Sequence, residues 1–291
     1  MIIQNKKLDA IDPIDAANMV AQYGYLAIEN SGASPEEFAK WNLDMGYHIS
    51  PDIWCTDKEH SEYFWRVTNE KVDGENQGLF ADDELDWHSN LVPHADAQEI
   101  IGLYGKTITY DTETWVCSSI PFMRDLSEST KKFYKSLTTR LWHTGGTPIN
   151  QPWRPDWDKK YSSEVINGIK QNRNKSKVNL VNDKFPEWRG VIAEHFLVPN
   201  HPLGVEGMFF QPYDIVDFPG ILDSFQLYNE ILHGYVQDKY TYKHKWKPGD
   251  ILLMDQFTTI HRRPTVSKDK TRELLRSACW YKNRKHYDYV L

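Results

Sequence analysis

The chain has 291 residues, of which 34 are Lys or Arg and 41 are Asp or Glu, so its formal net charge is −7. This acidic excess argues against nucleic acid as a partner, because a nucleic-acid backbone attracts basic surfaces. No stretch approaches the ~20 apolar residues that span a bilayer, and residues 1–7 lack the apolar core of a signal peptide. We therefore expect a soluble protein that does not act at a membrane.

The cysteines and the length bear on compartment and domain number. Cys55, Cys117 and Cys279 are scattered without a CxxC spacing, which argues against a zinc site or a disulfide framework and predicts a cytoplasmic location. The length suits one large domain over residues 1–291. Residues from about 145 to 190 are rich in Gly, Pro, Asn and Lys, which predicts a polar surface insertion, with a lid over a site as one role for it.

The first elements predicted along the chain are two helices around a strand. Apolar residues recur at helical spacing over 13–23, and 25–28 follows as a short strand. A second helix begins after Ser34, because Glu37 stands three residues later and completes a capping box. We expect this helix to end at Gly46.

The middle of the chain is predicted to hold strands and one longer helix. Aromatic and β-branched residues predict strands at 63–67, 103–105 and 108–110. A helix is predicted from 127 to about 142, with a buried stripe made by Phe133, Leu137 and Leu141.

The C-terminal half alternates between short apolar runs and turn residues, a pattern typical of a β-rich protein. The predicted strands are 194–198, 208–210, 240–246, 251–254 and 276–281, and a helix is predicted over 220–233. The fold class expected from all the elements is mainly β with flanking helices.

The most informative stretch is Trp87-His88-Ser89-Asn90. On a strand, His88 and Asn90 would point to the same face and could contact one metal ion. A second histidine, His261, lies far along the chain, and two histidines with one carboxylate form the ligand set of non-haem Fe(II) oxygenases.

These residues resemble the taurine dioxygenase-like branch of the Fe(II)/2-oxoglutarate oxygenases. That family carries Trp-His-x-Asp, a Thr about 26 positions later, and a distant His followed by Arg at +11 and +15. This chain has His88, Thr114, His261, Arg272 and Arg276 at those spacings. The resemblance implies a double-stranded β-helix, the cupin-like jelly roll, and Fe(II) and 2-oxoglutarate as cofactors.

The resemblance also implies a role for each residue. His88, His261 and Asn90 would be the metal ligands and the catalytic centre. Arg272 and Thr114 would bind the far carboxylate of 2-oxoglutarate. Arg276 would join these cofactor-binding residues at the family position that meets the anionic group of the substrate. The expected reaction oxidises a small anionic or amino-acid-like molecule and releases succinate and CO2, and a homo-oligomer is compatible with the sequence.

Asn90 is the one departure from the core pattern, because the family has Asp there. Three interpretations follow. Asn90 could ligate iron through its amide oxygen in a hydroxylase; it could leave a site for water or halide, as the Gly or Ala of the family's halogenases does; or the protein could be an inactive binding protein. A nearby acid could instead replace the ligand, and the candidates are Asp83, Asp86 and Asp255.

Further residues are pocket candidates by their place beside the family's pocket strands, with core packing as the alternative for the aromatic ones. They are Ser50, Trp115, Phe209, Phe210 and Gln211. Arg262 and Arg263 follow His261 directly and should face opposite ways, so at most one of them points at the site.

Overall fold

The computed structural model describes residues 1–49, 51, 56–78, 84–90, 98–143, 191–212, 215–264, 267 and 270–282. The predicted insertion at 145–190 lies outside these residues, as do two of the candidate site residues, Ser50 and Asp83. Among the described residues, no helix is long and apolar enough to cross a membrane.

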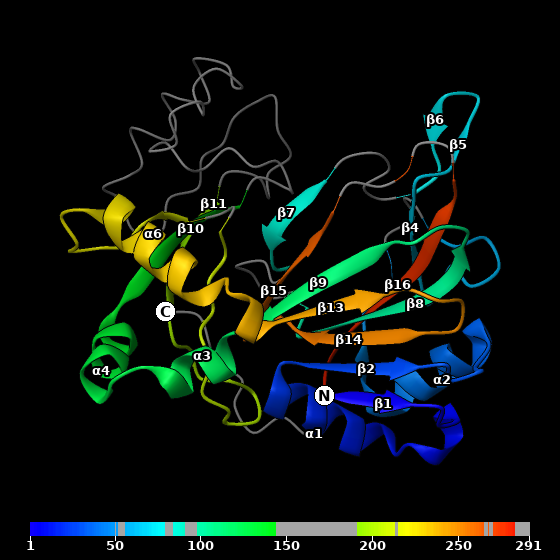
Figure 1. Cartoon of the computed structure of the whole chain (residues 1–291), viewed down its shortest axis with the longest axis horizontal. Helices are drawn as coiled ribbons and strands as arrows, with labels where there is room; N and C mark the ends of the chain where they lie inside the picture. Colours follow the sequence, from blue (N-terminus) through cyan, green and yellow to red (C-terminus); the bar gives the residue numbers. More distant parts are fainter. Residues whose placement is uncertain are drawn as a thin grey trace.

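The largest unit is a seven-stranded sheet (Figure 1). The pairing of β1 with β2 is parallel, and the other pairings in this sheet are antiparallel. The path runs β1 (Ile2–Gln4), β2 (Tyr25–Glu29), β14 (Ile251–Asp255), β8 (Ile100–Ile108), β16 (Arg272–Tyr281) and β3 (Gly46–His48), and β4 (Trp65–Thr68) also pairs with β16.

Helices α1 (Pro13–Tyr23) and α2 (Pro35–Met45) cover the outer face of this sheet (Figure 1). Both predicted starts are confirmed. Asp12 accepts hydrogen bonds from two backbone N–H groups of α1, and Ser34 and Glu37 form the capping box of α2. Gly24 ends α1 with φ 85°, a left-handed conformation that glycine adopts without steric cost.

A four-stranded antiparallel sheet lies against the inner face of the larger one. Its order is β13 (Thr241–Lys245), β9 (Glu113–Ser118), β15 (Thr259–Arg263) and β7 (Leu85–His88). Apolar side chains of both sheets form one core between them, for example Val116 of the small sheet with Met254 and Leu274 of the large one. Since side chains alternate along a strand, Arg272 and Arg276 share the inner face of β16 with Leu274.

The remaining helices and strands pack on the far side of the small sheet (Figure 1). Large buried aromatic residues such as Phe122, Phe210 and Tyr235 make the core there. The elements are α3 (Ser119–Asp125), α4 (Glu128–Ser136), β10 (Thr138–His143), β11 (Val191–Phe196), β12 (Ile215–Asp217), α6 (Ser224–Tyr235) and the 3-10 turn η3 (Asp238–Tyr240); η1 (Leu8–Ala10) and the hairpin β5 (Lys71–Val72) and β6 (Glu75–Asn76) lie elsewhere.

The prediction of one helix over 127–142 is wrong in its second half. Helix α4 ends at Ser136, and Thr138–His143 is strand β10, which pairs with β11 and β12. Phe133 is exposed on α4, whereas Leu141 is a buried residue of β10. The helical spacing of these residues was outweighed by hydrogen bonds to two neighbouring strands, helped by the β-branched Thr138 and Thr139.

Other boundaries also differ from the prediction. Helix α6 begins after its N-cap Asp223 and includes Gly234, residues 208–210 form no strand, and β8 is one continuous strand from Ile100 to Ile108. The predicted strand 251–254 lies in the large sheet as part of β14, whereas His261 lies on β15 of the small sheet. The residues of the candidate site therefore come from strands of both sheets.

Candidate metal and anion site

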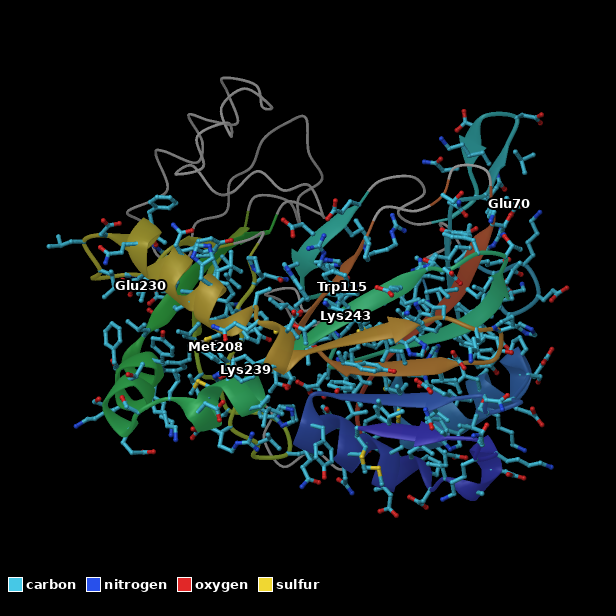
Figure 2. The ribbon with its side chains drawn as sticks, in the orientation of Figure 1. Glu70, Trp115, Met208, Glu230, Lys239 and Lys243 are labelled. Atoms are coloured by element: carbon cyan, nitrogen blue, oxygen red, sulfur yellow. The ribbon has the colours of Figure 1, made fainter. Side chains whose placement is uncertain are left out.

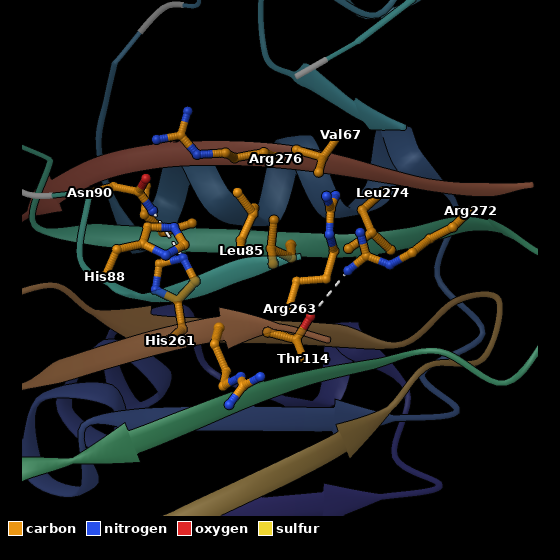
Figure 3. Close-up of a pocket in the computed structure, with 13 residues that line it drawn as sticks. Val67, Leu85, His88, Asn90, Thr114, His261, Arg263, Arg272, Leu274 and Arg276 are labelled. Atoms are coloured by element: carbon orange, nitrogen blue, oxygen red, sulfur yellow. Dashed lines mark hydrogen bonds between the residues drawn. The ribbon is translucent and has the colours of Figure 1, made fainter. Parts of the chain in front are cut away.

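The two histidines singled out in the sequence face each other across neighbouring strands. His88 at the end of β7 is the register partner of His261 on β15, and their ring centroids are 4.2 Å apart. Residues that are 173 positions apart in the chain are thus placed side by side by one strand pairing (Figure 3).

Burial keeps both imidazoles in the neutral form, and hydrogen bonding leaves one nitrogen of His88 available for ligation. His88 Nδ1 donates to the backbone oxygen of Asp86 at 2.7 Å, so Nε2 keeps its lone pair. Burial lowers the pKa of His88 to about 4. Burial, followed by the charges of His88 and Arg276, lowers the pKa of His261 well below its usual value. Both rings are neutral at pH 7, the form that binds metals.

Asn90 lies just beyond the end of β7 and faces the same place. Its Nδ2 donates to Nε2 of His261 at 3.2 Å (Figure 3). Two glutamines fix its backbone: Asn90 N donates to Gln256 Oε1 at 2.7 Å, while Gln211 exchanges hydrogen bonds of 2.7 and 2.6 Å with the backbone of Ser89. Gln211 therefore positions the motif from behind and does not line the pocket as expected.

A second group lies farther along the space between the sheets. Arg272 of β16 donates to Thr114 Oγ1 of β9 at 3.1 Å, and the indole N–H of Trp246 donates to the same oxygen at 2.9 Å. Burial and the neighbouring charge of Arg263 lower the pKa of Arg272 to about 9. The structure thus brings together the Arg and Thr predicted to hold a carboxylate, and adds Trp246, for which no motif or spacing in the sequence indicated a role at the site.

One cavity joins the two groups, and its lining is strongly cationic (Figure 3). The described residues of its lining include four arginines, of which Arg262 turns its guanidinium to the other face, and none of the described residues is acidic. They are Val67, Leu85, His88, Asn90, Ile101, Leu103, Thr114, His261, Arg262, Arg263, Arg272, Leu274 and Arg276. Such a cavity attracts anions. All six residues predicted from the sequence for metal and cofactor binding lie in it.

The other two arginines differ in orientation, as the alternation predicts. Arg263 is buried and shares the inward face with His261, whereas Arg262 stacks over Trp115, with its guanidinium carbon 4.9 Å from the ring centroid, and pairs with Glu84. Arg276 lies over the ring of Trp65, with its guanidinium carbon 4.7 Å from the centroid, and donates to Gln98.

Of the acids considered as substitute ligands, Asp86 and Asp255 lie among the described residues, and neither reaches the site. Asp255 is fully buried, and its Oδ2 accepts hydrogen bonds from His201 at 2.9 Å and Tyr281 at 2.6 Å. Asp86 accepts from the backbone N–H of Trp87, and neither aspartate lines the cavity. The Asp86 carboxylate binds the backbone, and the Asp255 carboxylate binds side chains of the core.

The aromatic candidates do not line the cavity and belong to the core beyond the small sheet, as the core-packing interpretation predicts. Phe209 and Phe210 are buried there. Trp115 points to the outer face, where Lys243 lies over its ring at 4.4 Å (Figure 2). Period-two alternation could have shown this, since Trp115 is next to Thr114 and must face the other way.

Solved structures with a similar fold include proteins described as dioxygenases. A taurine dioxygenase from Burkholderia xenovorans is 16% identical, covers 99% of this chain and 91% of its own, and has a TM-score of 0.66. A putative α-ketoglutarate-dependent taurine dioxygenase from that organism is 15% identical, with coverages of 99% and 88% and a TM-score of 0.65. AAD-2 in complex with Mn(II) and N-oxalylglycine is 14% identical, with coverages of 98% and 96% and a TM-score of 0.65.

A search of curated proteins gave no match. The family model that matches is described as taurine catabolism dioxygenase TauD, TfdA family, and it spans residues 4–278. That match implies a jelly-roll fold, with which the two facing sheets are consistent. By this match over nearly its whole length, the chain belongs to the TauD/TfdA family of dioxygenases.

Proposed function

We propose that this protein is an Fe(II)/2-oxoglutarate-dependent oxygenase that oxidises a small anionic or amino-acid-like substrate and releases succinate and CO2. The observation that carries the proposal is the single cavity that joins the pair His88 and His261 to the pair Arg272 and Thr114. The first pair suits a metal ion, and the second suits a carboxylate.

His88, His261 and Asn90 form a donor set that fits a divalent metal, although Asn90 is a weaker ligand than an aspartate. Neutral imidazoles suit Fe(II), and the N–H donation from His88 to Asp86 orients that ring. Asn90 now donates to His261, and half a turn about its last side-chain bond presents the amide oxygen instead. A neutral oxygen replaces the family's carboxylate, so these residues would hold Fe(II) less tightly than His, His and Asp would.

The same cavity fits 2-oxoglutarate. Arg272 offers a planar set of N–H donors for the far carboxylate, and Thr114 lies beside it at 3.1 Å. When bound, Fe(II) supplies the activation of dioxygen that is coupled to 2-oxoglutarate decarboxylation. The buried walls, including Ile101 and Leu274, exclude water around these charged groups and so strengthen their hold on an anion.

Arg276 is proposed to receive the anionic group of the substrate. It lines the cavity next to the histidine pair, since its charge lowers the pKa of both His88 and His261. Its stacking on Trp65 and its hydrogen bond to Gln98 hold the guanidinium in place. A substrate held there would lie beside the metal site.

The test is succinate formation with Fe(II), 2-oxoglutarate and dioxygen, followed while small carboxylates, sulfonates and amino acids are supplied. Succinate that tracks 2-oxoglutarate loss and disappears in His261→Ala supports an oxygenase. Lys243→Ala is a matched control, because this residue lies on the outer face of the small sheet. No succinate from protein with fully occupied metal would contradict the proposal.

Binding without turnover is the second candidate, and the hydrogen bond from Asn90 to His261 favours it. That bond occupies the lone pair that a metal needs. If the protein is such a binder, it should bind 2-oxoglutarate in the absence of iron and form no succinate when iron is added. The halogenase alternative has less support, because the Asn90 side chain fills space that a halide would need.

A further inference from the structure

Asn90, the weakest of the three proposed metal ligands, lies two residues beyond the end of its strand. Strand β7 ends at His88, the residue that pairs with His261. The backbone N–H of Asn90 donates to Oε1 of Gln256 at 2.7 Å, across 166 positions of the chain. Gln256 directly follows the last residue of β14, so a side chain next to the large sheet holds a proposed ligand of the metal site.

The partners of Gln256 determine which way its amide faces. Its Nε2 donates to the backbone oxygen of Met254 at 3.1 Å, an atom that can only accept. Its Oε1 faces the backbone N–H of Asn90, which can only donate. The hydroxyl of Ser89 also donates to the backbone oxygen of Gln256 at 3.0 Å. Exchanging the amide oxygen and nitrogen would break both side-chain contacts, so Gln256 presents one fixed acceptor to Asn90.

The turn that contains Gln256 is itself held by several hydrogen bonds. Gln256 is fully buried, and its backbone N–H donates to the backbone oxygen of Glu99 at 2.9 Å. Oδ1 of the preceding Asp255 accepts from the backbone N–H groups of Phe257 and Thr258 at 2.9 and 2.7 Å. It also accepts from the Thr258 hydroxyl at 2.8 Å. These bonds restrict the turn, so the acceptor that faces Asn90 has a defined position.

We propose that Gln256 is a positioning residue of the metal site, and that it sets the affinity for a divalent metal through Asn90. A fixed backbone limits the directions in which the short Asn90 side chain can point, and this side chain faces Nε2 of His261 (Figure 3). A neutral amide oxygen gains less from a metal than a carboxylate does, so it can offset less of the entropy lost when its segment is ordered. The inference rests on the proposed function for the role of Asn90 as a ligand.

A purely structural role for Gln256 leads to a different expectation. A buried amide that only satisfies the polar groups of its own turn contributes to stability, and its loss would not change metal affinity by way of Asn90. Thr258 offers the matched comparison, because its buried hydroxyl donates to Asp255 within the same turn. Metal affinity and stability, measured together, therefore distinguish the two roles.

The test measures Mn(II) binding to metal-free protein in the absence of 2-oxoglutarate, from the loss of the electron paramagnetic resonance signal of the free ion. The variants are Gln256→Met, Asn90→Ala and the two combined. Met has about the length of Gln but offers only a weak acceptor. The control is Thr258→Val, which removes one hydrogen bond of the same turn. Urea denaturation of each protein gives its free energy of unfolding.

We expect Gln256→Met to weaken Mn(II) binding by about tenfold or more, the loss typical when a group that orients a metal ligand is removed. Asn90→Ala should also weaken binding, and Gln256→Met should add no further loss in that background, because it acts through the Asn90 side chain. Thr258→Val should bind Mn(II) as the natural protein does. The free energy of unfolding should fall in both Gln256→Met and Thr258→Val, since each loses a buried hydrogen bond.

The proposal is overturned if Gln256→Met binds Mn(II) as the natural protein does, if its loss is as large in the Asn90→Ala background, or if Thr258→Val loses as much. If Gln256→Met does not fold, Gln256→Asn makes the same comparison, because it keeps the amide but withdraws it by one methylene group. A natural protein that binds no Mn(II) would overturn the metal site of the proposed function together with this inference. Mn(II) binding that shows the expected coupling, but without succinate formation, would overturn only the oxygenase.

Discussion

At the scale of single residues, the hydroxyl of Thr114 is held by its neighbours in one orientation. Its oxygen accepts from Arg272 at 3.1 Å and from Trp246 at 2.9 Å. Because a hydroxyl has two acceptor positions and one hydrogen, these two donors leave the hydrogen free to point at a carboxylate in the cavity. Trp246 is therefore a positioning residue for the anion.

Trp246→Phe should weaken 2-oxoglutarate binding by roughly fivefold, since it removes one hydrogen bond worth about 1 kcal/mol while keeping most of the ring. Calorimetry measures the change. Thr114→Val should cost at least as much, and Trp246→Phe should add nothing in that background. Additive losses in the double variant would mean that the indole acts on the site by another route.

At the scale of elements, the capped helices were the easiest part of the structure to predict. Both α1 and α2 begin and end as expected, because Ser34, Glu37 and Gly24 act through contacts within a few residues of themselves. The strand β10 could not be predicted in this way, since Thr138–His143 depends on partners 48 or more positions away. The residues near a segment do not indicate which distant strand it pairs with.

The candidate site shows the same division. His88, His261, Thr114 and the arginines at +11 and +15 could be selected from spacing alone, and the structure places them in one cavity. Alternation next to Thr114 turns Trp115 away from the site, but the placement of Phe209 and Phe210 could not be predicted in this way because they form no strand. For Arg262 and Arg263, alternation predicted that at most one points at the site, but it did not indicate which one.

Ser34→Ala should lower the free energy of unfolding by about 1 kcal/mol, because it removes the hydroxyl that accepts from the backbone N–H of Glu37 in the capping box that starts α2. Urea denaturation measures the loss. Ser34→Thr is the control, and it should keep most of the stability because its hydroxyl can accept the same N–H bond. An equal loss in both variants would point to packing of the serine, not to capping.

At the scale of the whole molecule, stability should fall in mild acid. Burial lowers the pKa of His88 and of His244 to about 4 and that of His261 well below its usual value. Between about pH 6.5 and pH 4 these groups take up protons when the chain unfolds but not when it is folded. The unfolded state then binds more protons, so the free energy of unfolding rises with pH and is lost as pH falls.

His244 allows this to be measured away from the histidine pair. It is fully buried in β13 beside Asp250, and its shift should contribute about 2 kcal/mol to the stability lost between pH 7 and pH 5. His244→Gln should therefore show a shallower fall of the unfolding free energy over that range. His233→Gln, at an exposed position, should keep the natural slope, and an equal flattening in both variants would contradict the assignment.

The most direct test of the whole account is an anaerobic titration of Fe(II) and 2-oxoglutarate, followed by the visible charge-transfer band of the chelate. We expect the band in both the natural protein and Asn90→Asp. The iron concentration needed for the band should be lower in Asn90→Asp by roughly tenfold or more, because the carboxylate adds one negative charge at the metal. A band in Asn90→Asp alone, with none in the natural protein at saturating iron, would contradict the claim that His88, His261 and Asn90 hold iron.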